Sequence, residues 1–221
     1  MTIKEEVMIK KFEEMGALLT GHFVLTSRPD DSPHRRHSSA YVNKDVISSF
    51  PDVVEAIAID LVDSERWFRD IDVVVAPAIG AIVFGSMLAS EIECRFAFAE
   101  PEDDKMVFKR GFSNLINLNR KVVIVEDIVT SSGTLKKMIA AVKALGGEIV
   151  GVVVMWQRGP IEISEGIKVV SLVNKEYPVY RAEDCELCHQ GITPNTEVGH
   201  GREFLLEFGT ISTNWPANKS N

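Results

Sequence analysis

Short apolar runs alternate with helical stretches from residue 71 onward. Two stretches, residues 81–90 and 135–145, carry apolar side chains at helical spacing, and Gly146-Gly147 ends the second one. Five apolar runs have the length of buried strands: residues 71–76, 94–99, 122–126, 149–155 and 167–172. Strands that alternate with helices predict an α/β fold, with a mostly parallel central sheet covered by helices.

The first part of the chain has a different pattern. Residues 3–19 place apolar side chains near helical spacing between Lys and Glu and predict an amphipathic helix. Residues 28–39 hold Pro, Asp, Ser, His and Arg without an apolar period, which predicts an exposed loop. Within it, His34-Arg35-Arg36-His37 is interpreted as a solvated turn. Pro51 then begins a second helical pattern that reaches Val62.

The length and composition fit one main domain. The chain has 221 residues, 45% hydrophobic and 25% charged, which is enough to bury one sizeable core. We expect a single domain over residues 1–210. Within it, residues 1–50 provide an N-terminal helix and an entry segment. Residues 211–221 are expected to form a flexible tail, because they are rich in Asn, Ser, Pro and Lys.

The charge and hydropathy patterns exclude several classes of protein. No apolar run approaches the ~20 residues of a membrane-spanning helix, and the N-terminus has no secretory signal, so we expect a cytoplasmic protein without a membrane partner. The net charge of -8 opposes nucleic-acid binding. An anionic small molecule could still be bound where backbone N–H groups and a few cations outweigh the overall field.

The three cysteines, Cys94, Cys185 and Cys188, are too few and odd in number for a disulfide framework. Cys185 and Cys188 form a CxxC pair followed by His189. This pair is compatible with half of a zinc site, with a redox pair or with a simple turn. A structural zinc ion needs four ligands, and the sequence has no second CxxC and no HxxxH, so no metal is assigned here.

The clearest candidate site follows the apolar run that begins at Val122. That run ends in two carboxylates, a series of small hydroxyl residues and a glycine, and a predicted helix comes next. Ligands of open α/β sheets bind at such carboxyl ends of strands. Small residues and free N–H groups at a helix start favour a phosphate, whereas paired carboxylates suit the vicinal hydroxyl groups of a ribose. A ribose 5-phosphate satisfies both halves of the motif.

A strand-to-helix turn with an Asp or Thr cap is the plainer alternative, but it does not explain two adjacent carboxylates. The segment has neither a Walker A lysine nor the spaced glycines of a dinucleotide fingerprint. It resembles the signature with which type I phosphoribosyltransferases bind 5-phosphoribosyl 1-diphosphate (PRPP). The resemblance makes the following residues the PRPP loop: Glu126, Asp127, Ile128, Val129, Thr130, Ser131, Ser132, Gly133 and Thr134.

Further segments resemble the orotate phosphoribosyltransferases of that family. Residues 73–81 are similar to the family's pyrophosphate loop, which would comprise Ala78, Ile79 and Gly80. Residues 108–112 are similar to the basic end of its mobile lid, although an ordinary charged hairpin would have the same composition. Residues 21–27 and 38–45 are similar to the two pieces of its N-terminal base-binding segment. Together these similarities cover roughly residues 17–160.

The resemblance implies a type I phosphoribosyltransferase fold with a small hood formed by N-terminal and C-terminal segments. It also implies orotate as the acceptor base, held by Arg158 and by Thr130, since a guanidinium can donate two parallel hydrogen bonds to a carboxylate. Mg2+ is expected to arrive with PRPP, and a homodimer is expected by the same resemblance. An exposed cation at the end of a strand is the plainer alternative for Arg158.

The chain also departs from the family pattern. The predicted lid, residues 100–106, is mostly acidic, so its catalytic cation is not fixed: Lys105 is a candidate, and Lys109 and Arg110 match the motif better. Arg28 replaces a usual glycine, and residues 29–36 resemble an insertion. Two alternatives therefore stay open. One is a phosphoribosyltransferase for another nucleobase, and the other is a non-catalytic PRPP-sensing regulator, which the negative charge and the absence of an appended DNA-binding helix pair disfavour.

Overall fold

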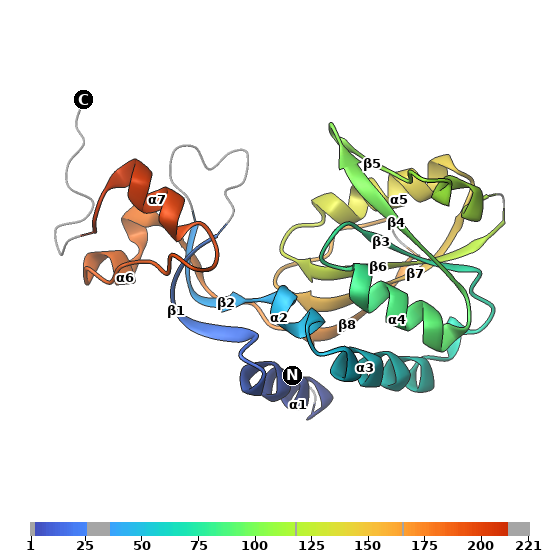
Figure 1. The fold of residues 1–221 in the computed structure, drawn as a ribbon, viewed down its shortest axis with the longest axis horizontal. Coiled ribbons are helices and arrows are strands. Elements are labelled where there is room, and N and C mark those ends of the chain that lie inside the picture. Colours follow the sequence, from blue (N-terminus) through green and yellow to red (C-terminus); the bar gives the residue numbers. More distant parts are fainter. Residues whose placement is uncertain (1–2, 26–35, 118, 165, 212–221) are drawn as a thin grey trace. The chain divides into compact units, whose positions relative to one another are not determined.

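A computed structural model describes residues 3–25, 36–117, 119–164 and 166–211 (Figure 1). Contacts divide the chain into two compact units. The first comprises Met1–Lys11 and Lys44–Glu176, and the second comprises Phe12–Asn43 and Tyr177–Asn221. Helix α1 (Ile3–Glu14) begins in the first unit and ends in the second. The single domain predicted for residues 1–210 stays a prediction.

The first unit is built on a six-stranded sheet with the order β5-β4-β3-β6-β7-β8. All neighbouring pairs are parallel except β4 and β5, which form an antiparallel hairpin. The strands are β3 (Val73–Pro77), β4 (Arg95–Glu102), β5 (Lys105–Val107), β6 (Lys121–Val129), β7 (Glu148–Gln157) and β8 (Lys168–Asn174). The helices are α2 (Lys44–Ser48), α3 (Pro51–Ser64), α4 (Ile82–Ile92) and α5 (Gly133–Ala144), with short 3-10 turns at Arg66–Phe68 and Phe112–Leu115.

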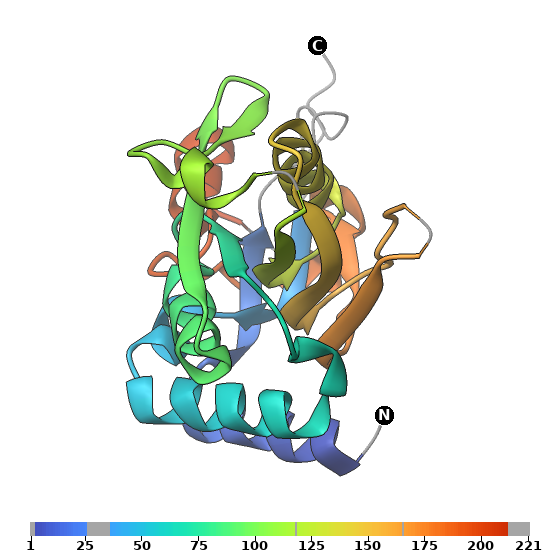
Figure 2. The same ribbon diagram turned by 90° about the vertical axis from the view of Figure 1, so that its right-hand side faces the viewer.

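One face of this sheet packs against α5 (Figures 1 and 2). Alternate residues of the central strands, including Val75, Ile124 and Val154, are fully buried in one cluster with α5 residues such as Met138 and Val142. Successive side chains of a strand point to opposite faces, and both faces of a parallel sheet are covered. This explains why the strands are continuous apolar runs rather than alternating ones.

The opposite face packs against α4. A β-carbon at Gly85 of α4 would lie 3.2 Å from the β-carbon of Ala76 and 2.8 Å from the ring of Phe96, so glycine lets the helix approach β3 and β4 closely. Helix α3 packs on α4. Two helical layers and a sheet thus enclose the core of the first unit, as expected for an α/β fold.

The second unit contains a three-stranded antiparallel sheet with the order β1-β2-β9. Its strands are β1 (Leu18–Leu25), β2 (Arg36–Val42) and β9 (Val179–Arg181), and its helices are α6 (Glu186–His189) and α7 (Gly201–Phe208), with a 3-10 turn at Ala182–Asp184. One buried cluster of this unit comprises Val24, Ala182, Cys185, Cys188, Phe204 and Ile211. Residues from the two ends of the chain therefore share one core.

All five predicted strands and both predicted helices after residue 71 are present, within a few residues of their expected bounds. The N-terminal prediction was wrong in two places. The helix expected over residues 3–19 ends at Glu14, and β1 begins at Leu18, because Gly16 adopts a φ of +70° that breaks the helix. His37, expected in a solvated turn, is fully buried in β2, whereas His34 and Arg35 lie outside the described residues.

The predicted loop at residues 28–39 is also only partly testable. Residues 36–39 belong to β2, and residues 28–35, with most of the supposed insertion, lie outside the described part of the chain. Ile211, the first residue of the expected tail, is buried, and residues 212–221 are not described. Among the described residues no helix has both the length and the apolar character needed to cross a membrane.

The buried centre of β6 should carry much of the stability of the first unit. Ile124→Ala would leave a cavity between the sheet and α5, since Ile124 is fully buried. The free energy of unfolding, measured by chemical denaturation, should fall by about 2–5 kcal/mol. The matched control is Ile59→Ala on α3, where the side chain is 44% exposed, and it should change stability by less than about 1 kcal/mol. Equal losses in both variants would contradict this packing.

Candidate active site

Three neighbouring parallel strands, β3, β6 and β7, end at the same edge of the sheet. The segments that follow them hold most of the residues singled out from the sequence. Backbone hydrogen bonds fix these segments: Ala78 N donates to Ala99 O over 2.8 Å, and Arg158 N donates to Val129 O over 2.7 Å. The predicted pyrophosphate loop, PRPP loop and Arg158 therefore follow adjacent strand ends within the first unit.

Glu126 lies near the end of β6 and is only 6% exposed. Its Oε2 atom is buried and has no hydrogen-bond partner among the described residues. Burial, and then the neighbouring Asp127, raise the pKa of the Glu126 carboxyl well above its usual range. A buried carboxyl that lacks a protein partner can bind a polar group of a ligand.

Asp127 is bound on both of its oxygens. Lys44 Nζ lies 3.2 Å from Oδ2, and Ile128 N donates to Oδ1 over 2.6 Å. Burial alone would lower the pKa of the Lys44 ammonium, but Asp127 and then Asp45 outweigh it and raise that pKa. A β-carbon at Gly80 would lie 1.7 Å from Asp127 Oδ2 and 2.3 Å from Lys44 Nζ. Only glycine therefore leaves room for this ion pair beneath the loop after β3.

The segment between β6 and α5 is open to solvent. Thr130, Ser131, Gly133 and Thr134 are exposed, and α5 begins at Gly133 with free N–H groups in its first turn. These N–H groups and the positive end of the helix dipole suit an anion. Ser132 is different: it is buried, and its Oγ accepts a hydrogen bond from Glu162 N over 2.7 Å. Its side chain holds the loop after β7, so its share in the anion site would come from its backbone.

Arg158 is buried at the end of β7, with 8% exposure, so it is not the exposed strand-end cation considered as the alternative. The next residue, Gly159, packs on the PRPP-loop backbone, where an added β-carbon would lie 2.7 Å from Thr130 O. Gln157 Nε2 donates to Gly159 O over 3.0 Å and accepts from Ser171 Oγ through Oε1 over 2.7 Å. This network fixes Arg158 beside Thr130, the pair predicted to hold the acceptor base.

The predicted lid forms the β4–β5 hairpin and the turn after it. Its cations are paired with its own carboxylates: Lys109 Nζ lies 2.6 Å from Glu102 Oε2, and Arg110 Nη2 lies 2.7 Å from Glu100 Oε1. The hydrogen bond to Glu102 raises the pKa of the exposed Lys109 ammonium. Glu100 and Glu102 therefore hold Lys109 and Arg110 together. From the sequence alone, these acidic residues had appeared unfavourable for a lid that supplies cations.

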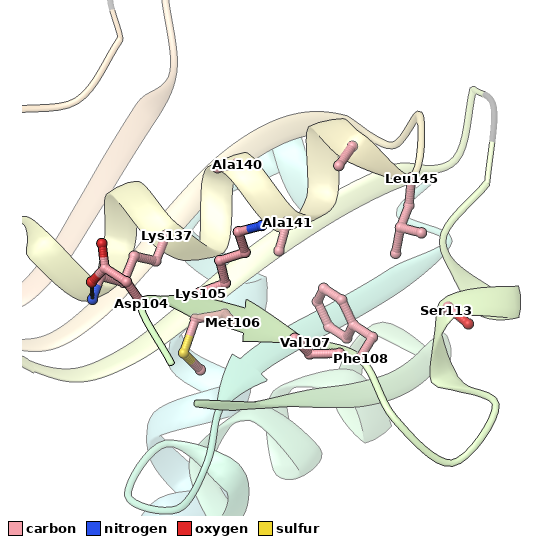
Figure 3. Close-up of a pocket in the computed structure, with 11 residues that line it drawn as sticks. Asp104, Lys105, Met106, Val107, Phe108, Ser113, Lys137, Ala140, Ala141 and Leu145 are labelled. Atoms are coloured by element: carbon pink, nitrogen blue, oxygen red, sulfur yellow. Dashed lines mark hydrogen bonds and ion pairs between the residues drawn. The ribbon is translucent and has the colours of Figure 1, made fainter. Parts of the chain in front are cut away.

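Lys105 lies apart from that pair. It lines a pocket of about 510 Å3 between β5 and α5, together with Met106, Phe108 and the apolar side of α5. Figure 3 shows Asp104 and Lys137, which form an ion pair, at one end of this pocket and Leu145 at the other. None of the residues 126–134 lines it. The pocket is thus distinct from the predicted PRPP loop.

Lys44 is a site residue that the sequence did not single out as such. It lay within the predicted base-binding segment, at residues 38–45, but no local motif indicates that it pairs with Asp127. The glycine at position 80 is a sequence signal for this ion pair. It can be interpreted only once the structure shows that the loop after β3 lies against Asp127 and Lys44. Long-range pairing of this kind requires the sheet order.

Comparisons with known proteins agree with this geometry. Residues 47–180, more than half of the chain, match the family model described as the phosphoribosyl transferase domain. The chain is 35% identical over 190 residues to the orotate phosphoribosyltransferase of Caldanaerobacter subterraneus subsp. tengcongensis, covering 86% of this chain and 95% of that protein. It is also 35% identical over 186 residues to the orotate phosphoribosyltransferase of Thermotoga maritima, covering 84% and 94%.

Solved structures show the same fold. The orotate phosphoribosyltransferase from Aeropyrum pernix superimposes with a TM-score of 0.59 at 22% identity, over 74% of this chain and 91% of that chain. The adenine phosphoribosyltransferase from Trypanosoma brucei gives a TM-score of 0.55 at 18% identity, over 75% and 79%. At these identities the likeness concerns the fold alone, and it confirms the predicted central sheet flanked by helices.

The buried Glu126 carboxyl should make stability depend on pH. A carboxyl whose pKa rises on folding binds its proton more tightly in the native state than in the unfolded chain. The free energy of unfolding therefore falls as the pH rises from the unfolded pKa, about 4.3, through the raised native value. Glu126→Gln removes this loss, so the variant should gain stability relative to wild type as the pH rises.

Chemical denaturation of both proteins between about pH 5 and pH 8 measures this difference. Glu55→Gln, at an exposed position on α3, is the matched control and should show a constant difference from wild type. A Glu126→Gln difference that is independent of pH would show that the carboxyl is not perturbed by its burial.

Proposed function

Because the chain belongs to the phosphoribosyltransferase family, and within it to the orotate phosphoribosyltransferases, we propose that it transfers ribose 5-phosphate from PRPP to orotate. The products are orotidine 5'-monophosphate and pyrophosphate, a step of pyrimidine (UMP) biosynthesis. The proposal depends on one observation: a carboxyl oxygen of Glu126, which has no hydrogen-bond partner in the described part of the chain, and the open N–H groups at the start of α5 follow the same strand, β6. Together they suit the hydroxyl groups and the phosphate of one ribose 5-phosphate.

The 5-phosphate would bind the backbone of residues 130–134. Two exposed hydroxyl side chains, Thr130 and Thr134, add donors to the N–H groups there. The ribose hydroxyl groups would bind Glu126 and Asp127, and the ion pair with Lys44 keeps the Asp127 carboxyl oriented. An anion can bind a chain of net charge -8 here because backbone dipoles and this lysine act at short range.

Pyrophosphate would leave toward the loop of Ala78, Ile79 and Gly80 and toward the lid cations. Lys109 and Arg110 are already held close to one another by Glu100 and Glu102. A pyrophosphate can compete for these cations because it carries more negative charge than a single carboxylate. The acidic lid would then hold the cations in place before the substrate arrives.

Orotate would be held by Arg158 and Thr130. A buried guanidinium interacts strongly with a carboxylate, because little water competes for its hydrogen bonds. A neutral base offers no carboxylate to this arginine, so Arg158 favours orotate over uracil or a purine.

The reaction needs little covalent help from the protein. A bond forms between the orotate nitrogen and the anomeric carbon of PRPP, and the bond from that carbon to the pyrophosphate oxygen breaks. The transition state resembles an oxocarbenium ion, so alignment of the base with the anomeric carbon supplies much of the rate. Lys109 and Arg110 stabilise the charge that develops on the departing pyrophosphate.

The proposal includes Mg2+ as a companion of PRPP. The oxygen atoms of Glu126 and Asp127 are of the type that Mg2+ prefers, and the Glu126 Oε2 atom has no hydrogen-bond partner among the described residues. The site therefore fits a ligand that carries this ion, which when bound would neutralise charge on the pyrophosphate. A homodimer is part of the same proposal and rests on the family resemblance. The cytoplasmic location expected from the hydropathy pattern is also part of it.

Pyrophosphate release from PRPP and Mg2+ tests the proposed reaction. Purified protein should release pyrophosphate with orotate, and not with uracil, hypoxanthine, adenine or guanine in parallel reactions. Turnover with one of the other bases would keep the PRPP site and contradict the role of Arg158. If no base supports turnover while PRPP still binds, the chain is a PRPP-binding regulator rather than an enzyme.

Loss of the Arg158 guanidinium should weaken orotate binding specifically. Arg158→Ala should raise the KM for orotate by about 10- to 100-fold, the value of charge-assisted hydrogen bonds, and leave the KM for PRPP within about threefold. Arg158→Lys should recover only part of the loss, because an ammonium lacks the planar fork. The control is the exposed Arg66→Ala, and an unchanged KM for orotate in Arg158→Ala would remove Arg158 from the site.

The lid cations should act on turnover rather than on orotate binding. The double variant Lys109→Ala and Arg110→Ala should lower kcat by about 10- to 1000-fold, as expected when charge stabilisation of the leaving group is removed. The KM for orotate should change little. Lys143→Ala, exposed near the end of α5, serves as the control for loss of a surface cation. Unchanged turnover in the double variant would exclude both residues as the cations of the reaction.

A further inference from the structure

Four metal-ligating side chains meet in the core of the second unit. His22, His37, Cys185 and Cys188 each offer one ligand atom, and these four atoms lie within 4.8 Å of one another. All four residues are buried, with exposures of 3%, 0%, 1% and 0% in that order. They come from three places in the chain: β1, β2 and the turn that leads into α6. The proposed reaction uses none of them.

We propose that this cluster, here called the Cys2His2 cluster, binds one structural zinc ion. Two thiolates and two imidazoles are a common ligand set for structural zinc, which is almost always bound by four protein ligands in a tetrahedron. Two thiolates would also balance the charge of Zn2+, so that the buried site carries no net charge.

Three sulfur–nitrogen distances fit such a site. Cys188 Sγ lies 3.2 Å from His37 Nδ1 and 3.7 Å from His22 Nε2, and Cys185 Sγ lies 3.6 Å from His22 Nε2. Zinc bonds of about 2.0 Å to nitrogen and 2.3 Å to sulfur place tetrahedral ligand atoms about 3.3–3.8 Å apart. The His22 Nε2 to His37 Nδ1 distance is 2.8 Å. The two rings need to separate by only about half an ångström to admit the ion.

The surroundings orient His22 as a ligand. His22 Nδ1 lies 2.5 Å from the carbonyl oxygen of Ile192, so it donates to that oxygen and leaves Nε2 free of a proton toward the cluster. Ligating histidines usually make this second hydrogen bond. The His37 ring packs edge-on against Phe204, with ring centroids 4.7 Å apart. This contact closes the cluster on one side with an apolar wall.

The backbone near each ligand also suits this role. The pairing of β1 with β2 is irregular between Thr20 and Phe23, where Gly21 has a φ of +150°. A bulge of this kind re-aims the side chain next to it, here His22. The Cys185–Cys188 spacing places both sulfur atoms on one side of a single helical turn, where His189 N donates to Cys185 O over 3.0 Å. His189 itself is exposed and bonds Glu183 O, so it is not a ligand.

The ion would also join elements that share one buried apolar cluster. Among the described residues this cluster has six buried members, and two of them are Cys185 and Cys188. Metals often stabilise small units of this kind. A zinc ion would join β1, β2 and α6 and would fix both ends of the segment between His22 and His37. The sequence shows no second CxxC because, in this proposal, the other two ligands are histidines far away in the sequence.

Metal analysis of the full-length protein tests the proposal without any substrate. The protein, purified without chelators from zinc-supplemented cells, should contain about one zinc ion per chain. Cys185→Ser with Cys188→Ser should lose it, and so should His22→Ala with His37→Ala. The matched controls Cys94→Ser and His189→Ala change the same residue types outside the cluster and should keep the zinc. Zinc retained after loss of both cysteines would overturn the assignment.

A spectroscopic measurement on the unaltered protein covers the case in which those variants do not fold. Cobalt exchanged into the protein should give the strong visible bands of a tetrahedral ion and a thiolate charge-transfer band. X-ray absorption should find two sulfur and two nitrogen neighbours at about 2.3 and 2.0 Å from zinc. A protein without metal that contains a Cys185–Cys188 disulfide would contradict the proposal, and iron or copper in the same place would contradict the choice of zinc.

Hydrogen exchange then tests the structural role. Chelation of the zinc should lower the protection of the described amides in Phe12–Asn43 and Tyr177–Asn221 by at least about tenfold, because these residues form the second unit. Amides in the central strands β3, β6 and β7 should keep theirs. Equal protection with and without the metal would show that the ion is not structural.

Discussion

The parallel pairing of β3, β6 and β7 is the constraint on which the rest of the site depends. Parallel strands place their carboxyl ends at one edge, so three segments far apart in the sequence become neighbours. Helix α4 contacts β3 and β6 on one face of the sheet, and α5 contacts all three strands on the other. The contact between Gly80, Lys44 and Asp127, and the hydrogen bond from Arg158 to Val129, are consequences of that pairing.

The balance of charges at this edge explains how an acidic chain could bind an anionic ligand. Burial raises the pKa of the Glu126 carboxyl, Asp127 is paired with Lys44, and the lid carboxylates Glu100 and Glu102 hold cations. Little negative charge is therefore left unbalanced where a phosphate would bind, and the first turn of α5 supplies N–H groups. The net charge of -8 describes the whole chain and not this edge.

The sequence predicted what is local and missed what is long-range. The apolar runs predicted every strand of the first unit except the short β5, and the contiguous residues 126–134 indicated the ligand class by themselves. The pairing of Lys44 with Asp127 depends on two distant segments, and so does the meeting of His22 and His37 with Cys188. The β1-β2-β9 sheet was missed for the same reason: β9 comes from a distant part of the chain, and β1 and β2 flank a polar segment that shows no apolar period.

The most direct test of the central claim is a crystal structure of the protein with PRPP and Mg2+. We expect the 5-phosphate on the backbone of residues 130–134 and the ribose hydroxyl groups within hydrogen-bonding distance of Glu126 and Asp127. We also expect the pyrophosphate beside Ala78, Ile79 and Gly80. PRPP bound elsewhere, such as in the pocket between β5 and α5, with residues 126–134 free of ligand, would contradict the account.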